Sequence, residues 1–325
     1  MKILILGAKG NLGQQLIKVF ATGNEVIGWD KGEIDITDRT LVFKKIKDIK
    51  PNAIINAAAY NAVDKCEASE DASATLGTGE FELAKRINGE APAILAQAAI
   101  DSGAVLVHYS SDYVFGGHAH HHNKTVKEIK QQGGFMEDDE PRPVNKYGQT
   151  KLIGELQIIK LSGKGLKWYL IRTSKLFGPK GESELAKPSF FEIMLKLAKE
   201  KNEIDVINDE TSCFTYTPDL AKATKELIDN NAGYGIYHIT NSEPCTWYRA
   251  AKELFKIAGV SIKVNPVPAD KFPRPAKRPK YSVLLNTKLE PMRDFREALR
   301  EYLNSCHPER SEGSRDSSVA DAPSE

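Results

Sequence analysis

The stretch Ile3-Leu-Ile-Leu-Gly7-Ala-Lys-Gly10-Asn-Leu-Gly13 decides the fold, because it joins a short apolar run to a glycine-rich turn. The apolar run predicts a buried strand, and the pattern after it predicts a helix over 11–21. A glycine loop at this junction lets the backbone approach a pyrophosphate, whose charge is favoured at the helix N-terminus. Asp30 ends the second apolar run, where a carboxylate can meet ribose hydroxyls. We therefore expect a dinucleotide-binding fold.

The first half of the chain alternates apolar runs with helical patterns, which is typical of a parallel sheet covered by helices. The runs predict strands at 3–6, 25–28, 53–56, 105–109 and 168–172. The patterns predict further helices at 41–47, 90–102 and 146–159. The expected fold class is α/β, a Rossmann-type doubly wound parallel sheet with a smaller C-terminal substrate-binding domain. Such sheets bind ligands at the carboxyl ends of their strands.

The second half has a looser pattern. Helices are predicted at 189–200, 219–229 and 247–258, and short strands at 205–207 and 236–239, with a proline-rich loop over 266–279. We expect residues 1–173 to form an NAD(P)-binding domain, with a return segment near 215–240. Residues 174–303 would then form mainly the substrate-binding domain. Residues 304–325 contain almost nothing to bury, so we expect a disordered tail there.

Bulk properties narrow the class of protein. The 325 residues carry a net charge of +1, from 45 basic and 44 acidic side chains, so no nucleic-acid surface is indicated. The four cysteines show no C-x-x-C spacing, which favours reduced thiols in a cytoplasmic protein. The N-terminal apolar run is too short for a signal peptide, and no run reaches the ~18 apolar residues of a membrane span.

Two further motifs carry chemistry: Ser110-Ser-Asp-Tyr-Val-Phe115 and Tyr147-Gly-Gln-Thr-Lys151. A Tyr and a Lys four apart share one helix face, and an ammonium beside a phenol lowers the tyrosine pKa toward neutrality. Ser111 could hold a substrate oxygen by a hydrogen bond while the tyrosine exchanges a proton with it. These parts suit hydride transfer. A second match, Tyr248 with Lys252, opens an amphipathic stretch and is expected to pack in a core.

The choice of cofactor is open from the residues alone. Asp30 favours NAD, whereas Lys9 and Lys31 stand near enough to attract the 2′-phosphate of NADP. The small residues of Asn56-Ala-Ala-Ala59 would admit a ribose and a nicotinamide ring. The segment Asp35-Ile-Thr-Asp38 could wrap the adenine, cap the next helix, or do both.

Two polar segments lack a strong pattern. Residues 69–78 read as a loop, and residues 116–134 contain His118, His120, His121 and His122. Clustered histidines could bind a metal, but no cysteine or nearby carboxylate completes a coordination set. We therefore expect a solvated insertion and no metal.

Over nearly everything before the tail, these motifs resemble extended short-chain dehydrogenases/reductases, and most closely the dTDP-4-dehydrorhamnose reductase family. The Ser-Asp-Tyr-Val-Phe phrase is the most diagnostic part. Further matches are Asn88-Gly-Glu-Ala-Pro92, Arg172-Thr-Ser174, Thr215-Tyr-Thr-Pro-Asp-Leu-Ala221 and the segment 274–286.

The resemblance implies a catalytic trio of Ser111, Tyr147 and Lys151, and a substrate sugar facing Ser111, Asp112 and Tyr113. It implies reduction of the 4-keto group of a dTDP-linked 6-deoxy sugar by NADPH, with NADH also possible, often in a homodimer. Together with the glycine loop, it implies these cofactor-binding residues: Gly7, Gly10, Asn11, Leu12, Gly13, Asp30, Asp35, Ile36, Ala59, Tyr60, Asn61, Tyr109, Tyr147 and Lys151.

The departures from the family pattern lie mainly on the substrate side. Lys175 stands where the rhamnose reductases usually place a tryptophan, and Ser212-Cys-Phe214 replaces an expected Gly and Pro. Gln15 replaces a glutamate that some members offer to a metal, which argues against a required ion. Two alternatives to the reductase stay open: another sugar-nucleotide epimerase or dehydratase of the extended short-chain class, and a non-catalytic NADP-binding regulatory subunit.

Overall fold

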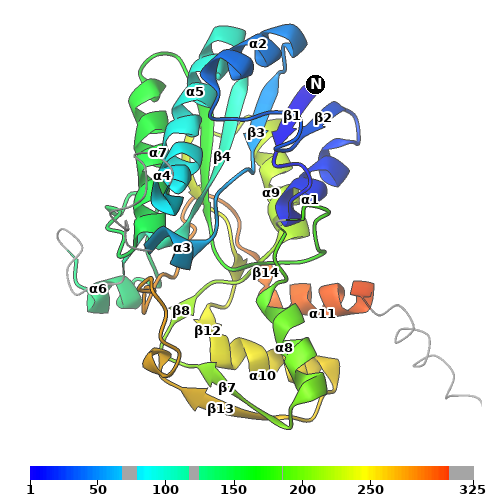
Figure 1. Ribbon diagram of the computed structural model, residues 1–325, viewed down its shortest axis with the longest axis vertical. Coiled ribbons are helices and arrows are strands. Elements are labelled where there is room, and N and C mark those ends of the chain that lie inside the picture. Colours follow the sequence, from blue (N-terminus) through cyan, green and yellow to red (C-terminus); the bar gives the residue numbers. More distant parts are fainter. Residues whose placement is uncertain (68–78, 117–123, 185, 307–325) are drawn as a thin grey trace, which may run out of the picture.

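The computed structural model describes residues 1–67, 79–116, 124–184 and 186–306. Its centre is a six-stranded sheet in the order β10-β5-β4-β3-β1-β2, and every neighbouring pair is parallel (Figure 1). The expected Rossmann-type parallel sheet is confirmed. Its strands are β1 Lys2–Leu6, β2 Glu25–Trp29, β3 Ala53–Asn56, β4 Val105–Ser111, β5 Lys167–Thr173 and β10 Gly235–His238.

Helices cover both faces of this sheet, because alternate side chains of a strand point to opposite faces. Along β1, Ile3 and Ile5 belong to one buried cluster, which includes side chains of α1 (Asn11–Phe20) and α9 (Thr217–Asp229). Leu4 and Leu6 belong to a second cluster on the opposite face. That cluster includes side chains of α2 (Arg39–Ile49), α5 (Ala91–Ser102) and α7 (Lys146–Ser162).

Short elements follow the carboxyl ends of β3 and β4. They are α3 Val63–Glu67, α4 Glu80–Ala84, the π-helical turn η1 Lys85–Glu90, the 3₁₀ turn η2 Asp112–Val114 and α6 Val126–Gln131. The helix predicted over 90–102 therefore begins earlier, as a π-helical turn. Asn88 lies within that turn, and its side-chain amide is hydrogen-bonded to the backbone of Tyr60 and to the Thr150 hydroxyl.

Helices α8, α10 and α11 and strands β7 and β13 lie below the sheet in Figure 1, and they contribute to an aromatic cluster. The cluster joins Phe177, Phe191, Phe214 and Tyr302. Its larger elements are α8 Phe190–Glu200, β7 Glu203–Ile207, α10 Trp247–Ala258, β13 Lys263–Val267 and α11 Phe295–Cys306. The short elements of this half of the chain are β6 Leu176–Phe177, β8 Thr211–Ser212, β9 Thr215–Tyr216, β11 Asn241–Ser242, β12 Cys245–Thr246, η3 Ala269–Lys271 and β14 Met292–Asp294.

Two sequence expectations about this part differ from the structure at their first residues. The predicted tail from residue 304 overlaps α11, a helix that buries Phe295, Leu299 and Tyr302 in the aromatic cluster. The proline-rich loop over 266–279 begins inside β13, which pairs only with β7 among the described residues. Pro266 is tolerated there because an edge strand leaves one side of its backbone unpaired.

Some expectations fall outside the described residues. They concern the loop at 69–78, the histidines at 118–122 and the tail beyond 306. Among the helices that the structure does describe, none combines the length and the apolar composition needed to span a membrane.

Candidate active site

The serine-rich end of β4 forms the centre of the candidate site. The 3₁₀ turn η2 follows Ser111 directly, and the Ser111 hydroxyl caps it by accepting a hydrogen bond from Tyr113 N at 3.1 Å. The same hydroxyl donates to Asp112 Oδ1 at 3.1 Å. Asp112 is buried, and its other oxygen accepts a hydrogen bond from Ser282 Oγ at 2.6 Å. The serine is therefore held at the carboxyl edge of the sheet.

Helix α7 brings the Tyr147–Lys151 pair to the same edge. Asn145 caps the helix by accepting a hydrogen bond from Gly148 N at 2.7 Å, and its amide donates to Lys277 O at 2.8 Å. The Ser111 side chain lies close enough to the Tyr147 hydroxyl to influence its pKa. The Tyr147 ring meets Tyr113 edge to face, with centroids 5.9 Å apart. The structure thus brings Ser111 and Tyr147 to the same edge of the sheet.

Lys151 lies one turn further along α7 and is buried. Its ammonium donates a hydrogen bond to the backbone carbonyl of Tyr109 at 2.7 Å. Burial lowers the pKa of Lys151 to about 8, and the nearby Glu155 carboxylate counteracts part of that effect. Lys151 is therefore anchored to β4, with a pKa closer to neutral pH than that of an ordinary lysine.

The expected lowering of the Tyr147 pKa is wrong for the structure as described. Burial raises the pKa of Tyr147 above its ordinary value, and the Asp112 carboxylate raises it further, although the Ser111 hydrogen bond opposes both. The phenol is consequently protonated at neutral pH. A protonated phenol is the form that a proton donor needs.

The glycine loop between β1 and α1 is shaped for close backbone approach. Gly7 has φ +75°, and a Cβ there would lie 2.7 Å from Ala58 N. Gly13 is equally restricted, since a Cβ would lie 2.1 Å from Gly7 O. Gly10 precedes the first residue of α1, and Leu12 is buried under the loop. Free amides at a helix N-terminus fit the pyrophosphate of a dinucleotide.

Asp30 directly follows β2 and lies beside this loop. Its carboxylate accepts hydrogen bonds from Lys9 N at 3.0 Å and from Lys31 N at 2.7 Å. The Lys9 ammonium lies 3.8 Å from Glu33 Oε1. The acidic group is thus fixed by backbone amides, at the position of the adenosine ribose in this fold.

The other expected cofactor residues divide into two groups. Asp35 is exposed and binds Thr37, whose hydrogen bonds lower the pKa of Asp35, while Ile36 is buried beneath it. Ala59 and Asn61 are exposed after β3, at the carboxyl edge of the sheet.

Two tyrosines expected at the cofactor direct their hydroxyls elsewhere. The Tyr60 hydroxyl binds Glu80, and the Tyr109 hydroxyl binds Thr224 Oγ1 at 2.6 Å inside the core. Tyr109 therefore contributes its carbonyl, which holds Lys151, more directly than its ring.

A segment that sequence reasoning missed covers the glycine loop. Gly181 N donates to Asn11 Oδ1 at 2.8 Å, and Ser183 N donates to Lys9 O at 2.9 Å. The Asn11 amide is therefore engaged with this segment. A Cβ on Gly181 would lie 2.5 Å from Lys9 O, so the approach itself requires a glycine. The signal in the sequence was only the Gly-Pro-Lys-Gly stretch after β6.

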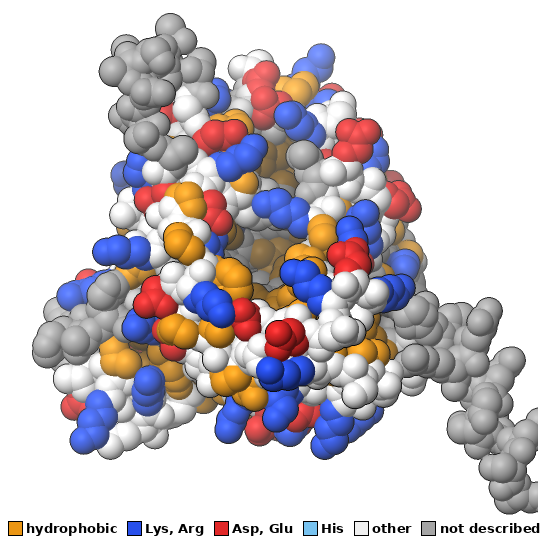
Figure 2. All heavy atoms as spheres, turned by 60° about the horizontal axis from the view of Figure 1, so that its bottom comes forward, with side chains coloured by type: hydrophobic (Ala, Val, Ile, Leu, Met, Phe, Trp, Pro, Cys, Tyr) orange, Lys and Arg blue, Asp and Glu red, His pale blue; other side chains and the backbone are white. Residues whose placement is uncertain are grey.

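A basic pocket of about 520 Å³ lies near the N-terminus of α7, since Val144 and Lys277 line it and Lys277 O is bound by Asn145. Arg278 binds the Asp64 carboxylate at 2.8 Å, and Arg274 binds Glu210. The Phe272 ring is exposed at the pocket. The remaining basic side chains of the lining are Lys277 and Lys280. The face in Figure 2 is hollowed near its centre, with hydrophobic side chains inside and Lys and Arg around the rim.

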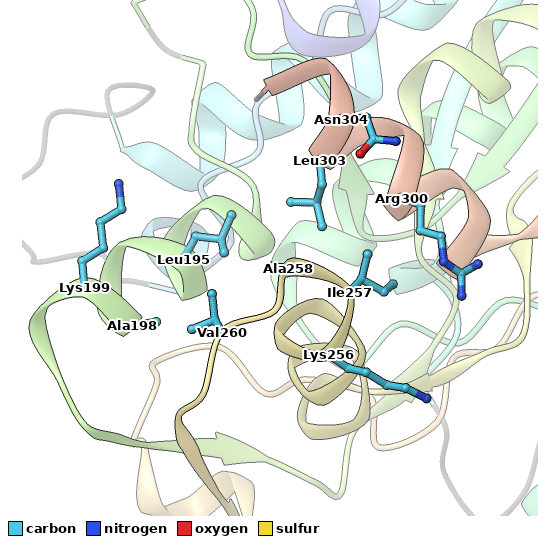
Figure 3. Close-up of a pocket in the computed structure, with 10 residues that line it drawn as sticks. All are labelled: Leu195, Ala198, Lys199, Lys256, Ile257, Ala258, Val260, Arg300, Leu303 and Asn304. Carbon is cyan, nitrogen blue, oxygen red and sulfur yellow. The ribbon is translucent and has the colours of Figure 1, made fainter. Parts of the chain in front are cut away.

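A second groove, of about 670 Å³, lies away from this edge, between α8, α10 and α11 (Figure 3). Leu195, Val260 and Leu303 line it, with Lys199, Lys256 and Arg300 among its charged residues. Helix α10 also carries Tyr248 and Lys252, whose ammonium lies over its own tyrosine ring at 5.7 Å. Within the described residues, no group of three or more His, Cys, Asp or Glu could hold a metal ion.

Comparisons with known proteins agree with this geometry. The family described as "RmlD substrate binding domain" matches residues 1–307. A spore coat polysaccharide biosynthesis protein of Bacillus subtilis is 34% identical over 307 residues, which covers 93% of this chain and 96% of that protein.

Two solved structures are similar over 94% of this chain and 99% of their own. A dTDP-4-dehydrorhamnose reductase of Clostridium acetobutylicum has a TM-score of 0.80 and 38% identity. One of Bacillus anthracis, in complex with NADP, has a TM-score of 0.80 and 32% identity. The chain therefore belongs to the dTDP-4-dehydrorhamnose reductase family.

Proposed function

We propose that this chain is a dTDP-4-dehydrorhamnose reductase, which reduces the 4-keto group of a dTDP-linked 6-deoxy sugar at the expense of NADPH, with NADH as the alternative cofactor. The observation that carries the proposal is the meeting of Ser111 and Tyr147 at the sheet edge, with Lys151 anchored one turn away. The family membership and the NADP bound to the Bacillus anthracis relative support the choice of reaction and cofactor.

The glycine loop and Asp30 would hold the dinucleotide. The Gly7 position admits a closely approaching backbone or phosphate only because it lacks a Cβ. A bound reduced nicotinamide supplies the hydride. Every other task in the reaction falls to side chains of this chain.

Tyr147 would supply the proton. Because its phenol is protonated at neutral pH, it can donate to the oxygen that gains negative charge as the carbonyl is reduced. Ser111 would hold that same oxygen, since its hydroxyl already lies close to the phenol. Lys151, held by Tyr109 O, would keep a positive charge near the phenolate that remains.

The basic pocket would take the nucleotide part of the substrate. Arg278 and Arg274 present planar donors suited to a diphosphate, and Phe272 offers an exposed ring for a base. The substrate sugar would then lie between this pocket and Tyr147, against Asp112 and Tyr113. The smaller part around the aromatic cluster would serve as the substrate-binding domain.

Two properties of the whole protein complete the proposal. We infer a cytoplasmic location, because Cys66, Cys213 and Cys245 are unpaired and buried. A homodimer is expected from the family resemblance alone.

The test is a screen of dTDP-, UDP- and GDP-linked 4-keto sugars with NADPH or NADH. Turnover is monitored as the loss of cofactor absorbance, and the products are then analysed. The proposal requires one NADPH consumed for each dTDP-sugar reduced. An isomerised sugar with no net cofactor consumption would instead identify an epimerase. Tight NADPH binding without turnover of any sugar would identify a regulatory subunit.

A further inference from the structure

The neighbouring strands β4 and β5 end together, and a buried charge follows each of them. Ser111 pairs with Thr173 in the parallel register, so Asp112 is the first residue after β4 and Lys175 the second residue after the adjacent β5. Asp112 is 2% exposed. The Lys175 ammonium is also shielded from solvent. Two opposite charges shielded from solvent therefore lie at the edge that carries Ser111, near enough to influence each other.

The Lys175 ammonium has no hydrogen-bond partner among the described residues. It is enclosed by aromatic rings instead, 3.7 Å from the centroid of Trp247 and 4.9 Å from that of Phe214. Its backbone has φ +40°, a conformation that few non-glycine residues adopt. A buried ammonium that makes only ring contacts has lost its hydration, so a nearby negative charge has a strong effect on it.

Asp112 is the complementary case. Its carboxylate accepts hydrogen bonds from Ser111 and Ser282 but, in the described part of the chain, forms no ion pair within 4.0 Å. Burial raises the pKa of Asp112 and lowers that of Lys175, and each group opposes the shift of the other. Lys175 also faces Glu210, Cys213 and Cys245, and Glu210 is already bound to Arg274.

We propose that Lys175 is the counter-charge of Asp112 and, through Asp112, a positioning residue for the Ser111–Tyr147 pair. This inference rests on the proposed reductase function for its catalytic half. An ionised Asp112 accepts the Ser111 hydrogen bond and so fixes the position of Oγ near Tyr147, from which the hydroxyl proton can turn to the oxygen of a bound substrate. Without Lys175, the buried carboxyl would hold a proton or leave its site, and Ser111 would lose its fixed orientation.

A double-mutant cycle of Lys175→Met and Asp112→Asn tests both halves. Methionine keeps the length of the side chain and the contacts with Trp247 but removes the charge. Each single substitution leaves one buried charge unopposed, whereas the double substitution removes both. In urea unfolding, we expect the double variant to be more stable than the sum of the single effects predicts, by about tenfold or more in the unfolding equilibrium constant.

The catalytic half is read from kcat. We expect Lys175→Met to lower kcat about tenfold, to leave NADPH affinity unchanged, and to be no further harmful when Asp112 is already asparagine. Lys175→Arg keeps the charge and should recover part of the loss. Lys160→Met, on the exposed side of α7, is the matched control and should behave as the wild type.

Each outcome decides the matter. Additive effects on unfolding would overturn the charge pair. Coupled unfolding with additive effects on kcat would reduce Lys175 to a structural role and overturn the positioning claim. If Lys175→Met does not fold, Lys175→Gln takes its place in the same cycle. A wild type that reduces no nucleotide sugar would remove the proposed function, and the unfolding cycle would still test the charge pair.

Discussion

The cofactor side and the substrate side of the sheet edge are built from different kinds of groups. The cofactor side is built from backbone: Gly7 and Gly13 leave room, amides open α1, and Asp30 is held by Lys9 N and Lys31 N. The substrate side is built from buried or partly buried charges, with Asp112, Lys175 and Arg278 drawn from distant segments. Such backbone geometry admits few residue types, so the sequence pattern of the cofactor side is constrained. Long side chains can place a charge in many ways, so the sequence of the substrate side can differ between relatives.

The largest effect is expected from Gly7→Ala, which attacks the backbone side. A left-handed alanine costs about 1–2 kcal/mol, and its Cβ, 2.7 Å from Ala58 N, adds about 1–3 kcal/mol of overpacking. The free energy of unfolding should fall by the sum, and NADPH binding should weaken. Gly103→Ala is the matched control, because Gly103 has φ +72° but nothing within 4 Å of its Cβ position. Equal losses for the two variants would contradict the close-approach argument.

A somewhat smaller effect is expected from buried Lys151, on the pH dependence of the free energy of unfolding. The pKa of Lys151 lies at about 8 in the folded protein against 10.5 for an ordinary lysine. At pH values between these two pKa values, the lysine is protonated in the unfolded chain but neutral in the folded protein. The free energy of unfolding should therefore rise with pH through this window. Each pKa unit corresponds to about 1.4 kcal/mol, which gives about 3 kcal/mol in all.

Lys151→Met should therefore lose this rise, while Lys160→Met should follow the wild type. The measurement is urea unfolding at a series of pH values from 8 to 10. A wild type and a Lys151→Met variant with parallel pH dependence would show that the lysine titrates normally.

On the substrate side, Arg278→Met should raise the KM for the nucleotide sugar about tenfold and leave the Kd for NADPH unchanged. The guanidinium is held by Asp64 at 2.8 Å in the basic pocket, so it is oriented before substrate arrives. Arg300→Met, in the second groove, is the control and should change neither constant. Equal effects of the two variants would move the nucleotide site away from the basic pocket.

The smallest effect is expected from Glu203→Gln, on the surface. Glu203 pairs with Lys263 at 2.9 Å, but both side chains are largely exposed. Solvent screens such pairs, so urea unfolding should show no measurable change. A clear loss would mean that the β7–β13 pairing depends on this contact.

The fold was largely predictable because local patterns determine it. The strand Ala53–Asn56 and the helix Trp247–Ala258 have the predicted bounds, since their apolar residues follow the strand and helix periods. The helix Phe295–Cys306 was not predicted, although Phe295, Leu299 and Tyr302 have helical spacing, and its last residues were assigned to the tail.

The site was predictable only in part. Motif and spacing predicted Ser111, Tyr147 and Lys151 as site residues, and the structure places all three at one edge of the sheet. The direction of the Tyr147 pKa shift was not predictable from the sequence, because it depends on burial and on the Asp112 carboxylate. The segment over the glycine loop and the ring enclosure of Lys175 arise from contacts between residues far apart in the sequence.

The central claim is that Tyr147 donates the proton during carbonyl reduction, and its most direct measurement is kcat for Tyr147→Phe beside Tyr248→Phe. Both variants remove one phenol hydroxyl from a Tyr-x-x-x-Lys match, but Tyr248 packs on α10 away from the sheet edge. The account predicts a loss of about 10²–10⁴-fold in kcat for Tyr147→Phe, with NADPH binding retained, and wild-type kcat for Tyr248→Phe. Retention of wild-type kcat by Tyr147→Phe would contradict it.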